Sequence, residues 1–236
     1  MEQPVIDLKR EQAATLARPR YPYSSLARLF FRSMDVLTGR RTTLAKARLI
    51  EMFAGVPYHA WERRQYVIMT KGYRNQGLVD EARTILAWAR EARENELWHL
   101  RVLEEKMHQD HLPEPWYLRA PIPQAMMAGY AILSWALARA DIRAAFLFNA
   151  EFEDHAEHTY AELVRDHPEW DGVPAASALA NVRGEMASWA DVVRRIALDE
   201  RDHMNNSLHF GGRDAWIVEY DGMPVLAANR ARVARR

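Results

Sequence analysis

Apolar residues recur along most of the chain at the three- and four-residue spacing of helices that bury one face. Between residues 24 and 37, for example, Leu26, Leu29, Phe30 and Met34 are interspersed with arginines. No run of strictly alternating apolar and polar residues is long enough to predict a sheet. The pattern therefore predicts an all-α protein.

Capping and breaking residues divide the pattern into segments. The expected helices cover residues 24–37, 43–70, 78–110, 122–139, 142–166 and 175–210. Gly55 and Pro57 should disturb the second of these helices, and Gly184 should interrupt the last. A turn over residues 72–77 and a proline-rich connection over residues 111–123 separate the longer elements.

The chain length of 236 residues suits one domain with a sizeable core. Residues 1–20 are expected to form a loose N-terminal arm. Residues 21–210 should form the helical domain, and residues 211–236 an irregular C-terminal tail that begins at two glycines and ends rich in arginine.

Composition narrows the classes of function. The chain has no cysteine, which excludes disulfides, zinc–thiolate sites, iron–sulfur clusters and thiol nucleophiles. Basic and acidic residues are equal at 32 each, so the net charge does not predict a nucleic-acid partner. The longest uncharged stretch, residues 120–138, contains Pro121, Pro123 and Gly129, and is expected to be a buried or membrane-lying helix rather than a span. Residues 1–12 lack the apolar core of a signal peptide.

Two Glu-x-x-His pairs stand on predicted helices, Glu96 with His99 and Glu200 with His203. Because residues three apart share a helix face, each pair can reach one ion. A single glutamate precedes each pair on the helix before it, 45 residues before Glu96 and 47 before Glu200. Bundles that bind two irons use this combination. The predicted ligands are Glu51, Glu96, His99, Glu153, Glu200 and His203.

Four carboxylates offset most of the charge of two ferrous ions, and two imidazoles complete the coordination while leaving positions open for dioxygen. Oxygen and imidazole ligands without thiolate favour iron or manganese over copper or zinc. A third such pair, Glu105 with His108, lies at a helix end and has no glutamate at a matching interval before it. One Glu-x-x-His pair alone is also common on solvated helix surfaces.

Around these residues the chain resembles the alternative oxidase family, the di-iron quinol oxidases that include plastid terminal oxidases. Four segments carry the resemblance in the family's order: IEMFAGVP at 50–57 is similar to LETVAAVP, ENELWHL at 94–100 to ENERMHL, EDHAEHTY at 153–160 to EEEAxHTY, and DERDH at 199–203 to DExxH. Trp116 and Tyr117 also match a Trp-Tyr pair ahead of the apolar helix.

The resemblance implies a ferritin-like four-helix bundle with additional short helices, in which the six predicted ligands hold two iron ions. It also implies that Tyr160 is a redox-active tyrosine beside the metals. Tyr160 follows Glu153 by seven residues, so both share a helix face. A plain core tyrosine is the alternative. Asn95 and Asp199 would orient the ligands through hydrogen bonds.

The positions that bind quinol in the family are partly altered. Lys46 stands where the family has an arginine, and His155 where it has a glutamate, whereas Thr159 is retained. The resemblance implies that these three residues line the quinol pocket. At two other positions where the family has an arginine, this chain has Ala197 and Met204. Because lysine lacks arginine's planar fork, the identity of the reducing substrate stays open.

The implied function is a quinol:oxygen oxidoreductase that reduces dioxygen to water without pumping protons. The resemblance further implies a homodimer on the cytoplasmic face of a bacterial inner membrane, attached to one leaflet through residues 24–37 and 122–138. A di-iron oxygenase or desaturase acting on a small organic substrate, soluble in the cytoplasm, is the main alternative. Iron storage or metal sensing on such a bundle, and a structural bundle with incidental Glu and His, are the others.

Overall fold

The computed structural model of the protein describes residues 6–229, apart from the side chain of residue 183, and these residues form helices and no β-strand. The predicted all-α class is thereby confirmed. The α-helices are α1 (Leu8–Ala17), α2 (Ser25–Thr38), α3 (Leu44–Lys71), α4 (Gln76–Gln109), α5 (Ile122–Ala140), α6 (Ile142–Asp166) and α7 (Trp189–Phe210). Short 3₁₀ turns lie at Trp116–Leu118, Pro168–Gly172, Ala180–Arg183 and Asp214–Trp216.

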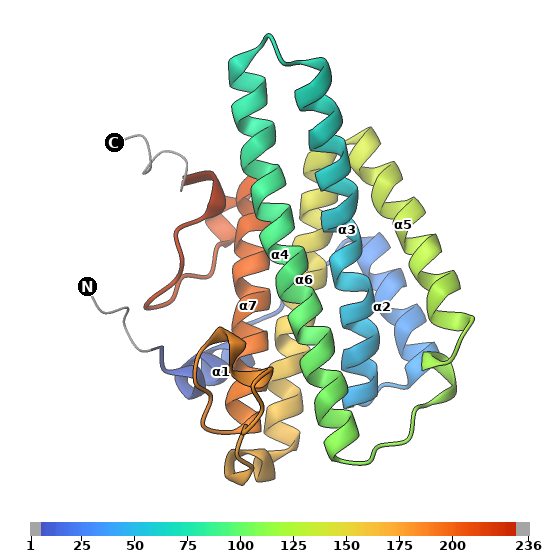
Figure 1. The fold of residues 1–236 in the computed structure, drawn as a ribbon, viewed down its shortest axis with the longest axis vertical. Coiled ribbons are helices and arrows are strands. Elements are labelled where there is room, and N and C mark those ends of the chain that lie inside the picture. The colour runs from blue at the N-terminus through green and yellow to red at the C-terminus, as the bar shows by residue number, and fades with distance from the viewer. Residues whose placement is uncertain (1–5, 230–236) are drawn as a thin grey trace.

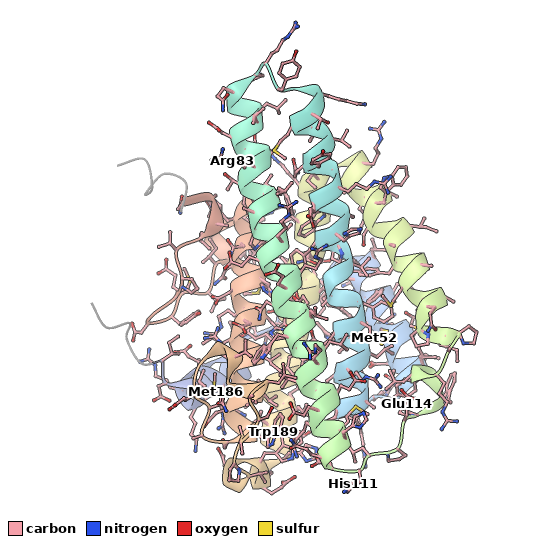
Figure 2. The ribbon with its side chains drawn as sticks, viewed as in Figure 1. Met52, Arg83, His111, Glu114, Met186 and Trp189 are labelled. Carbon is pink, nitrogen blue, oxygen red and sulfur yellow. The ribbon has the colours of Figure 1, made fainter. Side chains whose placement is uncertain are left out.

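Four long helices lie side by side and enclose the core (Figure 1). α3 packs along α4 and α6 along α7, and the two pairs meet through contacts of α3 with α6 and of α4 with α7. α5 flanks α3, α2 contacts α6, and α1 lies against α6 and α7. His111, just after α4, lies at the opposite end of the molecule from the turn between α3 and α4 (Figure 2).

Side-chain caps explain where these helices begin. Ser24 accepts a hydrogen bond from a backbone N–H in the first turn of α2, and Thr43 does the same for α3. Asn75, Asp141 and Ser188 cap α4, α6 and α7 in the same way. Each cap satisfies a backbone donor that the helix itself leaves without a partner.

α3 runs unbroken through Gly55 and Pro57, so the predicted disturbance there does not occur. A proline inside a helix removes one hydrogen bond and crowds the preceding turn. Residues on both sides of it, Phe53, Tyr58 and Trp61, are buried in the core. Their tertiary packing keeps the helix continuous, since packing contributes more to helix stability than local propensity does.

α7 begins at Trp189, so the predicted helix start at residue 175 is wrong. Gly184 has a φ of 119°, which a right-handed helix cannot include. Asn181 also stabilises the loop, because its amide donates to the Ala175 carbonyl (2.9 Å) and its oxygen accepts the Met186 N–H (2.7 Å). Such side-chain bonds to the backbone compete with helix formation.

The N-terminal segment is ordered against the bundle, and the predicted loose arm is wrong for residues 8–17, which form α1. Residues 1–5 of that arm and 230–236 of the predicted tail lie outside the described residues. Arg201 on α7 is buried and donates hydrogen bonds to Glu11 (2.6 Å) and Thr15 (2.8 Å) of α1 and to Glu157 (2.9 Å) of α6. One guanidinium therefore joins three helices.

The chain after α1 adds to this attachment. Arg18 donates to Asp154 (2.6 Å) and Glu157 (2.7 Å), and the Tyr23 hydroxyl donates to Asp154 (2.7 Å). We call residues 7–23 the N-terminal clasp, because they fasten α6 to α7. Buried charges of this kind are tolerated only when they are paired and hydrogen-bonded, as they are here.

No helix in the described part of the chain is both long and apolar enough to cross a membrane. Large apolar side chains are nevertheless exposed on two helices. Leu29 and Val36 on α2, and Ile132 and Trp135 on α5, are all more than half exposed. Grouped exposed apolar residues mark surfaces that contact another protein or a lipid.

Replacing Arg201 with alanine should lower the free energy of unfolding by about 3–5 kcal/mol, because the buried Glu11 would lose its partner and Glu157 would keep only Arg18 as a cationic one. Chemical denaturation followed by circular dichroism measures the change. Arg165→Ala, which removes an exposed guanidinium paired with exposed Asp166, is the control and should cost less than about 1 kcal/mol. Equal losses of unfolding free energy in the two variants would show that Arg201 stabilises the fold no more than an exposed ion pair does.

Candidate metal centre

The six predicted ligands come from four helices and meet inside the bundle. α3 and α6 contribute one glutamate each, and α4 and α7 contribute one Glu-x-x-His pair each. All six side chains are buried, with at most 5% of their residue surface exposed: Glu51, Glu96, His99, Glu153, Glu200 and His203. Polar groups buried to this degree need partners, and in the described structure these residues are one another's neighbours.

The six side chains form two groups, each of which can hold a metal ion. Within each group, one ligand atom from every residue lies within 4.8 Å of the others. Glu96 and Glu200 belong to both groups, the first of which adds Glu51 and His99 and the second Glu153 and His203. If both groups held an ion, Glu96 and Glu200 would be the carboxylates that the two ions share.

Both imidazoles turn Nδ1 toward the shared carboxylates. His99 Nδ1 lies 3.1 Å from an oxygen of Glu200 and 3.2 Å from one of Glu96. His203 Nδ1 lies 2.8 Å from Glu96 and 3.4 Å from Glu200. The α3 glutamate, Glu51, lies 3.4 Å from His99 Nδ1. A ligand nitrogen and carboxylate oxygens thus converge at each position.

One oxygen of each of the four carboxylates is buried and accepts no hydrogen bond of good geometry; these are Oε2 of Glu51, Oε1 of Glu96, Oε2 of Glu153 and Oε1 of Glu200. An imidazole nitrogen lies 2.8–3.4 Å from the first, second and fourth of these oxygens, and among the described residues none lies beside Glu153 Oε2. Four buried carboxylates that turn oxygens and imidazole nitrogens toward one point are the donor set of a cation site. The donors are carboxylate oxygen and imidazole nitrogen, which suit iron or manganese. The residues present therefore fit a pair of such ions.

The crowding of carboxylates shifts their pKa values when no cation separates them. Burial and the charge of Glu200 raise the pKa of Glu51 well above its usual range. Burial and the charges of Glu200 and Glu96 do the same to the pKa of Glu153. Burial also opposes ionisation of Glu96, but the charges and hydrogen bonds of His203 and its partner histidine outweigh it and lower that pKa. The site thus needs protons or cations to be stable.

A hydrogen-bonded group holds the outer side of His99. His99 Nε2 lies 3.3 Å from Asp199 Oδ2, and Asn95 donates to the same oxygen (3.2 Å). Arg195 donates to the other oxygen of Asp199 (2.6 Å). A carboxylate on the outer nitrogen of a metal-ligating imidazole fixes the orientation of the ring. Sequence reasoning identified Asn95 and Asp199 but missed Arg195, which stands one helical turn before Asp199.

Two tyrosine hydroxyls donate to the glutamates that the two groups do not share. Tyr160 of α6 donates to Glu51 of α3, and Tyr58 of α3 donates to Glu153 of α6 (2.7 Å). Burial and the neighbouring glutamate raise the pKa of each tyrosine well above its usual range, so both hydroxyls keep their protons. Sequence reasoning missed Tyr58, although it follows Glu51 by the same seven residues that separate Tyr160 from Glu153.

The three residues expected to line a quinol pocket lie near each other, but little open space lies beside them. Lys46 is buried and paired with Asp35 (2.5 Å), and the half-buried ring of His155 stacks on Phe31 with centroids 4.0 Å apart. The space that both line is only about 10 Å³. Thr159 donates to the backbone carbonyl of His155 (2.7 Å) and does not line it. Burial and the charges of Arg20 and Lys46 lower the pKa of His155 to about 3.

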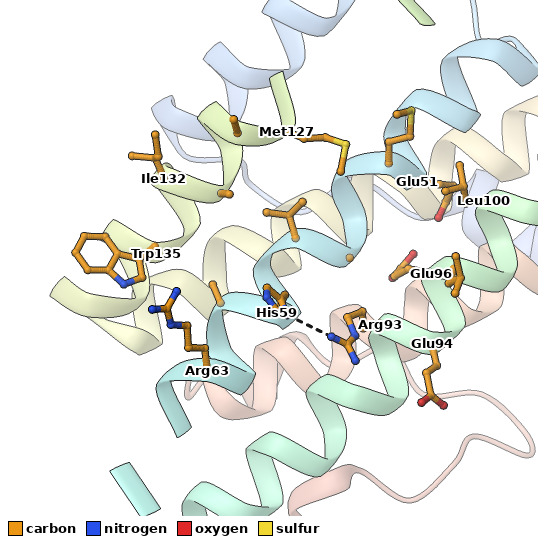
Figure 3. Close-up of a pocket in the computed structure, with 17 residues that line it drawn as sticks. Glu51, His59, Arg63, Arg93, Glu94, Glu96, Leu100, Met127, Ile132 and Trp135 are labelled. Atoms are coloured by element: carbon orange, nitrogen blue, oxygen red, sulfur yellow. Dashed lines mark hydrogen bonds between the residues drawn. The ribbon is translucent and has the colours of Figure 1, made fainter. Parts of the chain in front are cut away.

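A much larger space opens on another side of the metal centre, between α3, α4 and α5 (Figure 3). This cleft has a volume of about 1020 Å³ and includes Glu51 and Glu96 in its wall. His59, Arg63 and Arg93 also line it, and the first two are exposed. Apart from the exposed Glu94, the rest of the wall is apolar, with small residues that leave the space open: Met52, Gly55, Val56, Ala60, Leu97, Leu100, Met127, Ala128, Ala131, Ile132 and Trp135.

Iron-loaded protein should carry two metal ions per chain by elemental analysis. His99→Ala removes a ligand from one group only and should reduce the content to about one ion. Glu200→Ala removes a shared ligand and should reduce it to near zero. His108→Ala, which removes the exposed histidine of the third Glu-x-x-His pair, is the control and should retain two ions. Two ions retained by the Glu200 variant would contradict the assignment.

A scan against models of protein families finds no matching family, and a search of curated proteins finds no matching sequence. What the centre binds must therefore be argued from its own side chains. Those side chains provide two adjoining groups that could each hold an ion, two carboxylates that belong to both groups, and a cleft that leads to one edge of the site.

Proposed function

We propose that the chain is a quinol:oxygen oxidoreductase of the alternative oxidase type, built on a ferritin-like four-helix bundle with a di-iron carboxylate centre. One observation supports this most strongly: α3, α4, α6 and α7 form two ligand groups that share Glu96 and Glu200. Di-iron bundles take one glutamate from each of two helices and a Glu-x-x-His pair from each of the other two. The four segments that resemble the family supply the same six residues.

Iron fits the charge and the chemistry of the site. Four carboxylates would balance the four positive charges of two ferrous ions. A bound pair of iron ions would supply electrons for the reduction of dioxygen to water. Manganese would also suit oxygen and imidazole ligands, so the metal content of the native protein is part of the test.

The neighbouring residues would keep the site dry and rigid. Asp199, fixed by Arg195, would hold the ring of His99 in its ligating orientation. The Tyr160 hydroxyl holds a proton against Glu51 and would release it together with an electron during turnover. The burial of all six ligands keeps bulk water away from the reaction.

The reducing substrate needs a path to the centre, and we place it in the cleft between α3, α4 and α5. The space beside Lys46 and His155 is about the size of one water molecule. The cleft is large enough for a quinol ring and the start of its apolar chain, and it borders Glu51 and Glu96. Its apolar wall suits such a molecule.

The same cleft favours a second candidate, a di-iron oxygenase or desaturase acting on a small organic substrate. The quinol pocket implied by the resemblance is filled by Phe31 and its neighbours, and Lys46 is already paired with Asp35. Arg63 at the cleft would suit an apolar substrate with an acidic group, whereas Arg93 is paired with Glu62 (3.2 Å). Such an enzyme would couple oxygen uptake to a modified product.

Attachment to one leaflet on the cytoplasmic face of a bacterial inner membrane, and a homodimer, belong to the same proposal. The exposed Leu29 and Val36 on α2 and Ile132 and Trp135 on α5 support an apolar contact surface. An interfacial helix places such residues in the lipid headgroup region. The oxygenase alternative requires no membrane contact, and that protein would be soluble in the cytoplasm.

Iron-loaded protein in detergent should consume dioxygen when a ubiquinol or menaquinol analogue is added, and should oxidise two quinols per dioxygen. Glu200→Gln should slow uptake more than about 100-fold, since losing even an outer partner of a metal ligand costs about 10–100-fold. Oxygen uptake that requires another organic molecule and yields a hydroxylated or desaturated product would favour the second candidate. No uptake with either class would contradict both.

A bulky side chain at Ala131 should block the cleft. We expect Ala131→Trp to raise the KM for the reductant about 10-fold without changing the metal content, because it occupies space that the substrate needs. His155→Asn, which alters the filled space beside Lys46, should leave the KM within about twofold. The opposite result would place the substrate beside Lys46 and His155.

A further inference from the structure

A seven-residue interval occurs twice at the metal centre. Tyr58 follows Glu51 on α3, and Tyr160 follows Glu153 on α6, each by seven residues. Seven residues make about two helical turns, so each tyrosine lies on the face that carries its glutamate. Each hydroxyl then donates to the glutamate of the opposite helix, Tyr58 to Glu153 and Tyr160 to Glu51. The two tyrosines therefore occupy equivalent positions around the two ligand groups.

We propose that Tyr58 is a second redox-active tyrosine of this centre, which gives up one electron to the oxidised metal pair and its phenolic proton to Glu153. The inference rests on the proposed di-iron function. In this step Tyr58 is oxidised by one electron and the metal pair is reduced by one electron. The O–H bond of Tyr58 breaks, and Oε1 of Glu153, already 2.7 Å away, takes the proton.

The hydrogen bonds around Tyr58 leave Glu153 as the acceptor of its phenolic proton. The Asn149 amide nitrogen lies within hydrogen-bond distance of the Tyr58 hydroxyl (3.1 Å), Glu153 (2.8 Å) and Ser207 (3.1 Å), and its two hydrogens can serve two of these acceptors. Because the Glu153 carboxylate accepts, the Tyr58 hydrogen points to Glu153. Tyr58 is fully buried, so no water competes for the proton. Proton transfer within an existing hydrogen bond needs no rearrangement of the site.

The surroundings of Tyr58 also provide the next electron donors. Its ring lies 5.1 Å from the Trp61 ring and 5.6 Å from the Trp88 ring, centroid to centroid. The two indoles stack on each other at 5.4 Å. All three rings are buried, Trp88 with 3% of its surface exposed. Indole and phenol are the side chains most easily oxidised after thiol, and this chain has no cysteine.

This tryptophan pair distinguishes Tyr58 from Tyr160. Among the described residues, no aromatic ring contact joins Tyr160 to another ring, so its electron comes from the phenol alone. An electron passed from Trp61 or Trp88 would restore Tyr58, and the proton would return from Glu153. The oxidised indole would then be reduced by a one-electron donor in solution, such as ascorbate or a thiol. Tyr58 thus connects the metal centre to a second route for electrons.

The test uses freeze-quench paramagnetic resonance on the full-length, iron-loaded protein, mixed with dioxygen in the absence of quinol. Incorporation of ring-deuterated tyrosine separates tyrosyl from tryptophanyl signals. We expect an organic radical in the wild type, and loss of more than half of the tyrosyl signal in Tyr58→Phe. Tyr160→Phe is the matched control and should retain the Tyr58 signal. Trp61→Phe with Trp88→Phe should prolong the life of the tyrosyl radical several-fold.

Metal content, measured on the same samples, separates a redox role from a merely structural one. If Tyr58→Phe lowers the iron content but leaves the radical yield per iron unchanged, Tyr58 only positions Glu153 and the inference is wrong. Radical formation without quinol oxidation would reject the quinol reaction and support the Tyr58 step. Quinol oxidation with no Tyr58-dependent radical would support the quinol reaction and reject the Tyr58 step. Protein that binds no iron would overturn both proposals.

Discussion

Four carboxylates buried around one point are the constraint on which the rest of the structure depends. A buried charge without a partner costs several kcal/mol, and like charges at this spacing cannot all ionise. Cations between Glu96 and Glu200 would turn mutual repulsion into shared attraction, so binding and folding would be linked. The inward carboxylate oxygens, the inward Nδ1 atoms and the raised pKa values of Glu51 and Glu153 are consequences of this single arrangement.

The arrangement is close to twofold. α3 with α4, and α6 with α7, each provide a glutamate followed by a Glu-x-x-His pair, and each half places a tyrosine against the glutamate of the other half. The hydrogen bonds from Tyr58 to Glu153 and from Tyr160 to Glu51 therefore join the two halves beside the clustered glutamates. The environments outside this level differ, because one half opens into the cleft beside α5 and the other is held by the N-terminal clasp. The near-symmetric centre therefore has an open cleft on one side and a clasped, filled structure on the other.

Most helix positions, and the six side chains that meet in the bundle, could be predicted from the sequence because both depend on local spacing. Glu96 and His99 share a face at any position of a helix, and the caps at Ser24 and Thr43 act within one turn. The missed features depend on partners distant in sequence. Pro57 is tolerated in α3 because the residues around it pack in the core. Glu11 of α1 is paired only because Arg201 of α7 lies beside it. The ring of Phe31, from α2, fills the space beside His155. Tyr58 had a local signal, the repeated interval, that was overlooked.

The N-terminal clasp has a consequence for the order of events during synthesis. Glu11 leaves the ribosome early, whereas its partner Arg201 lies 190 residues later, beside the ligand Glu200. The Glu11–Arg201 pair can therefore form only once α7 has been made, and α7 brings two of the six clustered side chains with it. Neither ligand group is complete before that point, so a nascent chain that lacks α7 could not hold metal in either group.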